Sequence, residues 1–310
     1  MVNARLSYRS LINAAAGLIL LFQTVPAIGQ STLEAQIAQI AGQINGRVGV
    51  YAQVLETGES ASYNAGEKYP MQSVYKFPIA MAVLDKVDKG ELSLDQQIRV
   101  DTVEYIPENG HSPLRDKFPG GTSLTVRELL NYNVAESDGT ACDVLLRLLG
   151  GTGKAQKYVR RLGVKDIAIA TTEQIQVAND LIQYRNWSTP KAMTQLLRIF
   201  YMEKPLSEKS TTLLLKYMSH SGPWFDRRIK GLLPPGTPVV HKTGTAGTIN
   251  GLTRATNDAG IITLPDGKHI AISVFIADSY ATQKDREVTI AKISRAVYDH
   301  YAICCSGPTS

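Results

Sequence analysis

The sequence predicts an α+β fold, with one antiparallel sheet built from both termini and flanked by helices, and an all-helical domain inserted between the two halves of the sheet. Segments with strand-like composition lie before residue 70 and again after residue 234, and the residues between them show the apolar spacing of helices. The chain has 310 residues, 44% of them hydrophobic and 20% charged. It can therefore bury a large core in one or two domains.

The first 29 residues have the pattern of a secretory signal peptide. Arg5 and Arg9 precede an apolar run at residues 18–22, and small residues follow at positions 27–29. The apolar run is short for a membrane span, so we expect a protein released into the periplasm with no membrane contact after cleavage. Cleavage near Gln30 removes two arginines and no acidic residue, which lowers the formal charge from +5 to +3. This mild charge does not indicate a nucleic-acid partner.

After the signal peptide, a helix is predicted over residues 33–44, followed by strands over 48–55 and 60–63. The next part of the chain changes to helical spacing. The predicted helices there span residues 73–88, 126–134, 141–149, 192–202 and 210–218. These segments define the all-helical domain, which we place at residues 70–220.

Strands return in the last part of the chain, at residues 239–244, 248–256, 261–264 and 269–277, and a helix is predicted over 287–301. Turn-forming residues at 257–260 and the Asp266–Gly267 pair are expected to separate these strands. Residues 30–69 and 221–310 would then share one sheet domain. The cleft between this domain and the helical one is the natural place for a binding site.

The cysteines and histidines do not indicate a disulfide framework or a metal site. Cys142 lies in an apolar helical segment and is expected to be a small buried residue. Cys304 and Cys305 are adjacent near the C-terminus. The sequence does not choose between disorder, a strained disulfide between the two and an intermolecular disulfide. The five histidines lack metal-ligand spacing, so we expect neither a metal nor another cofactor.

Ser73-Val74-Tyr75-Lys76 is the first candidate for chemistry. A serine hydroxyl needs a proton acceptor nearby to act as a nucleophile, and residues three apart lie on one face of a helix. The pattern is weak alone, because Ser188-Thr189-Pro190-Lys191 matches it as well. That second match is better explained as the start of a helix with proline in its first turn.

Two later segments support a catalytic interpretation of the Ser73 segment. Ser137-Asp138-Gly139 and Lys242-Thr243-Gly244-Thr245, read with the Ser73 segment, resemble the three motifs of class A serine β-lactamases. The resemblance extends over nearly the whole mature chain. Residues 72–92 and 255–278 are similar to the branch that contains extended-spectrum cephalosporinases.

The resemblance implies a role for each matching residue. Ser73 would attack the lactam carbonyl, with the backbone N–H groups of Ser73 and Thr245 binding the oxyanion. Lys76 would move the serine proton, and Ser137, held by Lys242, would protonate the lactam nitrogen. Glu173 would be the general base that activates the deacylating water. The implied substrate-binding residues are Thr243, Gly244, Thr245, Arg228, His111 and Gly139.

Several positions leave alternatives open. Gly139 and Val177 replace asparagines that the family usually has, one contacting the substrate side chain and one helping to hold the deacylating water. Arg228 would bind the substrate carboxylate or would be a solvated charge beside other basic residues. His111 would line the cleft or would be a surface histidine. Asp138 is expected to be structural, bonding backbone N–H groups at the start of a helix.

The predicted function is hydrolysis of penicillins and cephalosporins through an acyl-enzyme, conferring β-lactam resistance, with a cephalosporin bias. We expect a monomer whose partner is the small-molecule β-lactam. The alternatives are a penicillin-binding D,D-peptidase and a binding protein that stays acylated. Glu173 favours the hydrolase, because an acyl-enzyme that no water attacks is an inhibited protein.

Overall fold

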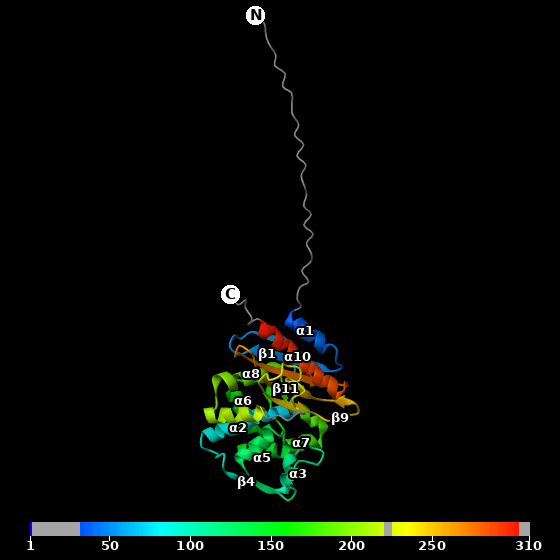
Figure 1. The fold of residues 1–310 in the computed structure, drawn as a ribbon. Coiled ribbons are helices and arrows are strands. Elements are labelled where there is room, and N and C mark those ends of the chain that lie inside the picture. The colour runs from blue at the N-terminus through cyan, green and yellow to red at the C-terminus, as the bar shows by residue number, and fades with distance from the viewer. Residues whose placement is uncertain (2–31, 220–224, 304–310) are drawn as a thin grey trace. The chain divides into compact units, whose positions relative to one another are not determined.

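The computed structural model contains a five-stranded antiparallel sheet with the strand order β2-β1-β12-β11-β8 (Figure 1). Its strands come from both ends of the chain: β1 (Arg47–Val54), β2 (Ser60–Tyr63), β8 (Val239–Thr245), β11 (Thr256–Thr263) and β12 (His269–Ala277). The structure describes Met1, residues 32–219 and residues 225–303. Beyond Met1, the predicted signal peptide lies outside the described residues, as do Cys304 and Cys305.

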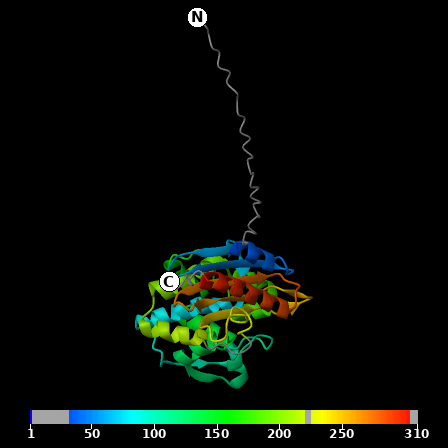
Figure 2. The same ribbon diagram turned by 45° about the horizontal axis from the view of Figure 1, so that its top comes forward.

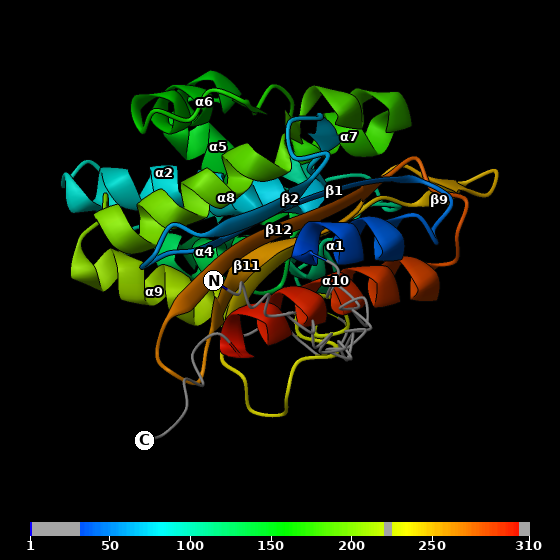
Figure 3. The ribbon, with the colours of Figure 1, turned by 90° about the horizontal axis from the view of Figure 1, so that it is seen from above.

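Helices cover both faces of the sheet (Figures 2 and 3). Helices α1 (Leu33–Ala41) and α10 (Gln283–Ile303) pack together on one face, and α8 (Pro190–Arg198) packs on the other. Strand β12 shows why this arrangement suits the sequence, because successive side chains of a strand point to opposite faces. Ile270, Ile272, Val274 and Ile276 join the core beneath α1 and α10, whereas Ala271, Phe275 and Ala277 join the core on the other side.

The segment between the two halves of the sheet is mainly helical. Its central helix is α2 (Lys76–Asp88), which is buried from Lys76 to Leu84 and is contacted by four other helices. An apolar helix with no polar face is stable only in such surroundings. Besides α8, the other helices of this segment are α3 (Pro113–Lys117), α4 (Val126–Val134), α5 (Gly139–Leu149), α6 (Thr152–Arg161), α7 (Glu173–Ala178) and α9 (Glu208–Ser219).

Polar residues fix the ends of these helices. Asp138 caps α5 by accepting a hydrogen bond from the Ala141 N–H group, which confirms its predicted structural role, and Gly150 ends the helix in the left-handed conformation. Thr189 caps α8 with Pro190 in its first turn, so the second Ser-x-x-Lys match is a helix start, as expected. Cys142 is buried within α5, also as expected.

The inserted segment also contains strands that the sequence did not suggest. Strands β4 (Gln97–Val100) and β5 (Thr122–Thr125) pair with each other, and β7 (Trp187–Ser188) lies between β3 (Tyr69–Pro70) and β6 (Ile167–Ala168). Short helical turns, η1 (Gln72–Tyr75), η2 (Thr102–Glu104), η3 (Asp180–Arg185) and the π-helical turn η4 (Ile199–Glu203), complete it. From Thr32 onward the chain forms one compact unit, and the domain boundaries near residues 70 and 220 stay predictions.

One predicted turn was wrong. Residues 257–260 lie inside β11 and are buried, because the side chains of Asn257 and Asp258 find partners there. Asn257 Nδ2 donates to the carbonyl oxygens of Pro70 and Met71, and Asp258 accepts from the Ile229 N–H group and bonds His241 Nδ1. The actual turn is at Asn250–Gly251, between β9 (Thr248–Ile249) and β10 (Leu252–Thr253).

None of the helices in the described part of the chain combines the length and the apolar character needed to cross a membrane.

Candidate active site

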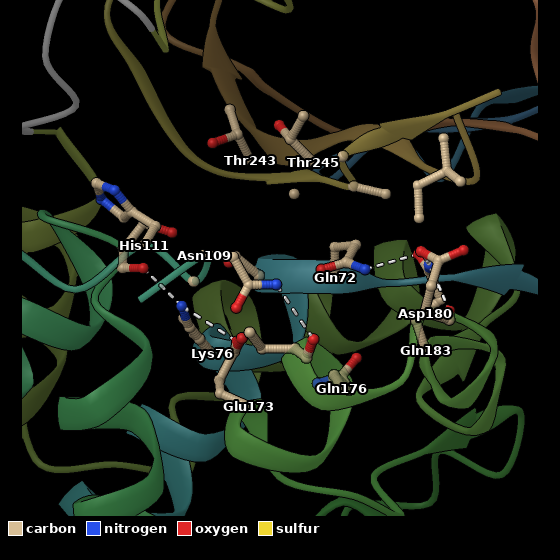
Figure 4. A pocket seen from close by; sticks show the side chains of 18 of the residues that line it. Gln72, Lys76, Asn109, His111, Glu173, Gln176, Asp180, Gln183, Thr243 and Thr245 are labelled. Carbon is tan, nitrogen blue, oxygen red and sulfur yellow. Dashed lines mark hydrogen bonds and ion pairs between the residues drawn. The ribbon is translucent and has the colours of Figure 1, made fainter. Parts of the chain in front are cut away.

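A cavity of about 480 Å³ lies between β8 and the helices α2 and α7. Most of the residues predicted from the sequence line it, namely Ser73, Lys76, His111, Ser137, Glu173, Thr243, Gly244 and Thr245. In Figure 4, Thr243 and Thr245 face Lys76, Glu173 and Gln176 across the cavity. We call residues 242–245 of β8 the sheet wall, and residues 171–186, which include α7 and η3, the helix wall.

The nucleophile candidate is held by rigid neighbours. Ser73 lies in η1, immediately before the buried helix α2, and the preceding Gln72 has a positive φ of 48°. The sheet wall packs directly on this backbone at Gly244. A Cβ atom there would overlap the Met71 carbonyl oxygen and would lie 3.1 Å from the Ser73 nitrogen. Glycine therefore allows β8 to approach the N–H group of Ser73.

Lys76 lies at the centre of the polar contacts and is only 1% exposed. Its Nζ atom donates to the Ser137 carbonyl oxygen at 2.6 Å and lies 3.2 Å from Glu173 Oε1. A buried ammonium group needs such partners, since leaving water without them costs several kcal/mol, on the order of 5. The contacts join three of the predicted catalytic residues within hydrogen-bond reach.

Lys242 is buried and does not line the cavity, but it contacts Ser137, which does. Lys242 Nζ donates to Ser137 Oγ at 2.8 Å, so the proton of the serine hydroxyl stays free to be donated to another group. Ser137 has a φ of 57°, an unusual conformation for a residue other than glycine. Burial, reinforced by the nearby charge of Lys76, lowers the pKa of Lys242 to about 7. Lys242 can therefore change its charge near neutral pH.

Glu173 begins the short helix α7, where the sequence suggested a loop. Thr172 caps this helix, and Asp143 on α5 accepts hydrogen bonds of 2.8 Å from the N–H groups of both Glu173 and Gln174. Burial, together with the charge of Glu173, raises the pKa of Asp143 to about 7, although the two N–H groups oppose this shift. Asp143 thus fixes the backbone that carries Glu173.

The remainder of the helix wall is held by side chains. Asn186 accepts from the N–H groups of Ala170 and Thr171 and donates to the Thr171 carbonyl oxygen. Gln72 Nε2 donates to Gln183 Oε1 at 2.6 Å, and Asp180 forms an ion pair with Arg254. These contacts connect the helix wall to the residue before Ser73.

Arg228 is not a solvated charge, so that alternative is wrong. Its side chain is 3% exposed and donates to Thr245 Oγ1 at 2.6 Å and to the carbonyl oxygens of Gly244 and Asn257. Glu287 lies 3.5 Å away and balances its charge. Arg228 does not line the cavity. It contacts Thr245, which does.

His111 lines the cavity, whereas Gly139 is buried behind its lining. A Cβ atom at Gly139 would lie 2.5 Å from Ile106 Cδ1 and 3.4 Å from Glu173 Cβ, so Ile106 fills the space beside this glycine. His111 is exposed, lines the cavity and has its Nε2 atom 2.9 Å from the Glu136 carbonyl oxygen. Both interpretations of His111 from the sequence therefore apply.

Sequence reasoning missed Gln176 and Asp143. Gln176 lies one helical turn after Glu173 and lines the cavity, and Asp143 supports the start of the same helix. The available signal was Thr172, a good N-cap residue placed just before Glu173. A helix beginning there would have put positions 173 and 176 on one face.

Comparisons with known proteins agree with this geometry. Residues 32–301 match the model of the β-lactamase enzyme family. The chain is 41% identical to the β-lactamase VEB-1 of Pseudomonas aeruginosa over 92% of its length and 96% of that protein's. It is 38% identical to the extended-spectrum β-lactamase PER-1 of the same species, over 94% of each. A β-lactamase crystal structure from Chitinophaga pinensis superimposes with a TM-score of 0.84 at 44% identity, covering 87% of this chain and all of that one.

Proposed function

The chain belongs to the β-lactamase enzyme family and is a class A serine β-lactamase, and on this basis we propose that Ser73 is the nucleophile that β-lactams acylate. The observation that carries the proposal is the pair of contacts around Lys76, which lies 3.2 Å from Glu173 Oε1 and 2.6 Å from the Ser137 carbonyl oxygen. Proton donors and acceptors for both halves of the reaction thus line the same cavity as Ser73.

Acylation begins when Ser73 Oγ attacks the lactam carbonyl carbon and gives its proton to the Lys76 and Glu173 pair. The N–H groups of Ser73 and Thr245 bind the oxyanion, each contributing roughly 3 kcal/mol. Ser137 Oγ, held by Lys242, then passes a proton to the lactam nitrogen as the C–N bond breaks. Relay of a proton from Lys76 back to Ser137 restores the hydroxyl.

Substrate binding uses the sheet wall. The charged form of Lys242 attracts the substrate carboxylate, and the hydroxyl groups of Thr243 and Thr245 donate hydrogen bonds to it. Gly244 lets the strand lie close to Ser73, and Arg228 orients the Thr245 hydroxyl from behind. At the other end of the cavity, His111 borders the substrate side chain, and the missing side chain at Gly139 leaves it no contact there.

Deacylation uses Glu173 as the general base. The carboxylate takes a proton from a water molecule, whose oxygen attacks the acyl carbonyl carbon. The tetrahedral intermediate then expels Ser73 Oγ, which takes the proton held by Glu173, so both residues are restored as the opened product leaves. This step distinguishes a hydrolase from a penicillin-binding protein.

The enzyme acts as a monomer in the periplasm, after export by the signal peptide at residues 1–29, and its preferred substrates are cephalosporins. The pattern of residues 1–29 and the similarity to an extended-spectrum β-lactamase support this part of the proposal. A steady-state panel of substrates tests it. Turnover of benzylpenicillin far more efficient than that of every cephalosporin would refute the preference.

The mechanism is tested with a chromogenic cephalosporin and purified mature protein. The wild type should show sustained turnover. Glu173→Gln should open one equivalent of lactam ring, seen as a colour burst, and then stall with the acyl group on Ser73, detectable by intact mass. Glu208→Gln makes the same change at an exposed position on α9 and should behave as the wild type. A stall in the wild type as well would refute a hydrolytic role for Glu173.

A further inference from the structure

We propose that Gln176 positions the deacylating water for Glu173, and this inference rests on the function proposed above. The two residues are three apart on α7, so their side chains lie on the same face of the helix. Both line the cavity, and both are almost fully buried, with exposures of 6% for Gln176 and 7% for Glu173. Figure 4 shows them side by side below the sheet wall.

The amide nitrogen of Gln176 is held by a hydrogen bond. Gln176 Nε2 donates to the Tyr75 hydroxyl at 3.3 Å, and the same hydroxyl is contacted by Cys142 Sγ at 3.5 Å. Tyr75 is fully buried in η1, two residues after Ser73. Burial raises the pKa of Tyr75 well above its usual value, so the hydroxyl keeps its proton. The Tyr75 contact therefore orients the Gln176 amide relative to the nucleophile.

The amide oxygen of Gln176 lacks a hydrogen bond within the described residues. Within the described residues, neither Gln176 Oε1 nor Glu173 Oε1 accepts one, although the latter has the ion pair with Lys76. A buried acceptor without a donor costs about 1–3 kcal/mol, so two of them one helical turn apart indicate a ligand that donates twice. Water has two O–H groups and fits a polar site of this kind.

Such a water molecule would be oriented for the reaction. With one proton directed to Glu173 and the other to Gln176 Oε1, its remaining lone pairs are available to attack the acyl carbonyl. The adjacent Val177 cannot supply this contact, because its side chain has no polar atom. Gln176 thus provides the acceptor from a neighbouring position on the same helix.

The test uses Gln176→Met, which keeps the length of the side chain and removes its hydrogen bonds, with Gln174→Met as the matched control. Gln174 is on the same helix, and its side chain is exposed. Stopped-flow mixing with the chromogenic cephalosporin gives the acyl-enzyme decay constant, and kcat/KM reports acylation. We expect the decay constant to fall at least tenfold in Gln176→Met with kcat/KM within threefold of the wild type, and no change above twofold in the control.

A second variant keeps the test decisive if Gln176→Met does not fold. Tyr75→Phe leaves the amide in place but removes its anchor, so the decay constant should fall about threefold or more with kcat/KM preserved. A decay constant unchanged in the folded variants, or an equal fall in kcat/KM, would overturn the inference and leave the proposed function intact. A wild-type enzyme that fails to hydrolyse the substrate would instead refute the proposed function.

Discussion

The two walls of the cavity are built by different kinds of interaction. The sheet wall belongs to strand β8, in which each residue from Val239 to Thr245 is paired with one on β11 in a continuous ladder. The helix wall contains only short helical elements and depends on side chains, above all on Asp143, Asn186 and Asp180. A backbone ladder survives most side-chain substitutions, whereas a segment fixed by single side chains does not.

The difference predicts where substitutions will act. On the sheet wall, damage requires a change that displaces the backbone or alters the charge of Lys242. On the helix wall, the loss of one carboxylate is sufficient.

The largest effect is expected where the sheet wall contacts the backbone before Ser73. Gly244→Ala places a methyl group against the Met71 carbonyl oxygen and the Ser73 nitrogen, and neither backbone group can turn aside as a flexible side chain would. We expect kcat/KM to fall about a thousandfold, because the oxyanion donors lose their spacing. Gly153→Ala on α6, where an added methyl meets open space, is the control for steady-state kinetics. A near-normal rate in Gly244→Ala would show that the strand can shift freely.

Asp143→Ala tests the helix wall. The change leaves the N–H groups of Glu173 and Gln174 without their acceptor, so we expect kcat to fall about a hundredfold through misplacement of Glu173. Urea unfolding should show a loss of about 2 kcal/mol. Asp143→Asn keeps one acceptor oxygen and should lose less. Wild-type kcat in Asp143→Ala would mean that the two walls are equally robust.

The titration of Lys242, on the sheet wall, predicts that kcat/KM depends on pH. Because its pKa is lowered to about 7, the ammonium form that attracts the substrate carboxylate is present below pH 7 and is lost as the pH rises through that value. Between pH 6 and pH 8, kcat/KM should fall about tenfold. Lys242→Arg keeps its charge, and its profile should be flatter over this range. Identical profiles in both enzymes would assign the titration to another group.

The smallest effect is expected at the hairpin beyond the sheet wall. Gly251 has a φ of 78°, and an added Cβ would meet only Tyr280 Cδ1, at an ordinary contact distance of 3.8 Å. Gly251→Ala should therefore destabilise the fold by about 1 kcal/mol through backbone strain. Turnover should stay within twofold of the wild type. Thermal unfolding and steady-state kinetics measure both quantities, and a large loss of activity would show that the hairpin shapes the cavity.

The same contrast explains what could be predicted from the sequence. The fold class and the strands at 60–63 and 269–277 are confirmed, because local composition and alternation specify a ladder. The turn was misplaced because Asn257 and Asp258 resemble turn residues, and their buried partners Pro70 and Ile229 are far away in the sequence. Asn250–Gly251 carried the stronger hairpin signal and was read as part of a strand.

The helix wall was harder to predict. Glu173 was identified through the motifs around it, but its helix and the partners Asp143 and Gln176 were not. The contacts that create this wall join residues far apart in the chain, such as Asp143 to Gln174 and Gln72 to Gln183. No local pattern marks such contacts, so their prediction requires the three-dimensional structure.

The pairing of β1 with β12 has a consequence for folding. Arg47 is opposite Ala277, and β8 joins the sheet through β11 and β12, which lie between it and β1. Pairing β1 with β12 closes a loop of most of the chain, and the entropy of that closure is lost before the stabilising contacts form. Folding is therefore slow. The sheet cannot close until nearly the whole chain is available. The β8–β11 ladder is local in sequence, so the slow step is the addition of β1, and truncated chains that end before β12 lack the strand that joins β1 to the rest of the sheet.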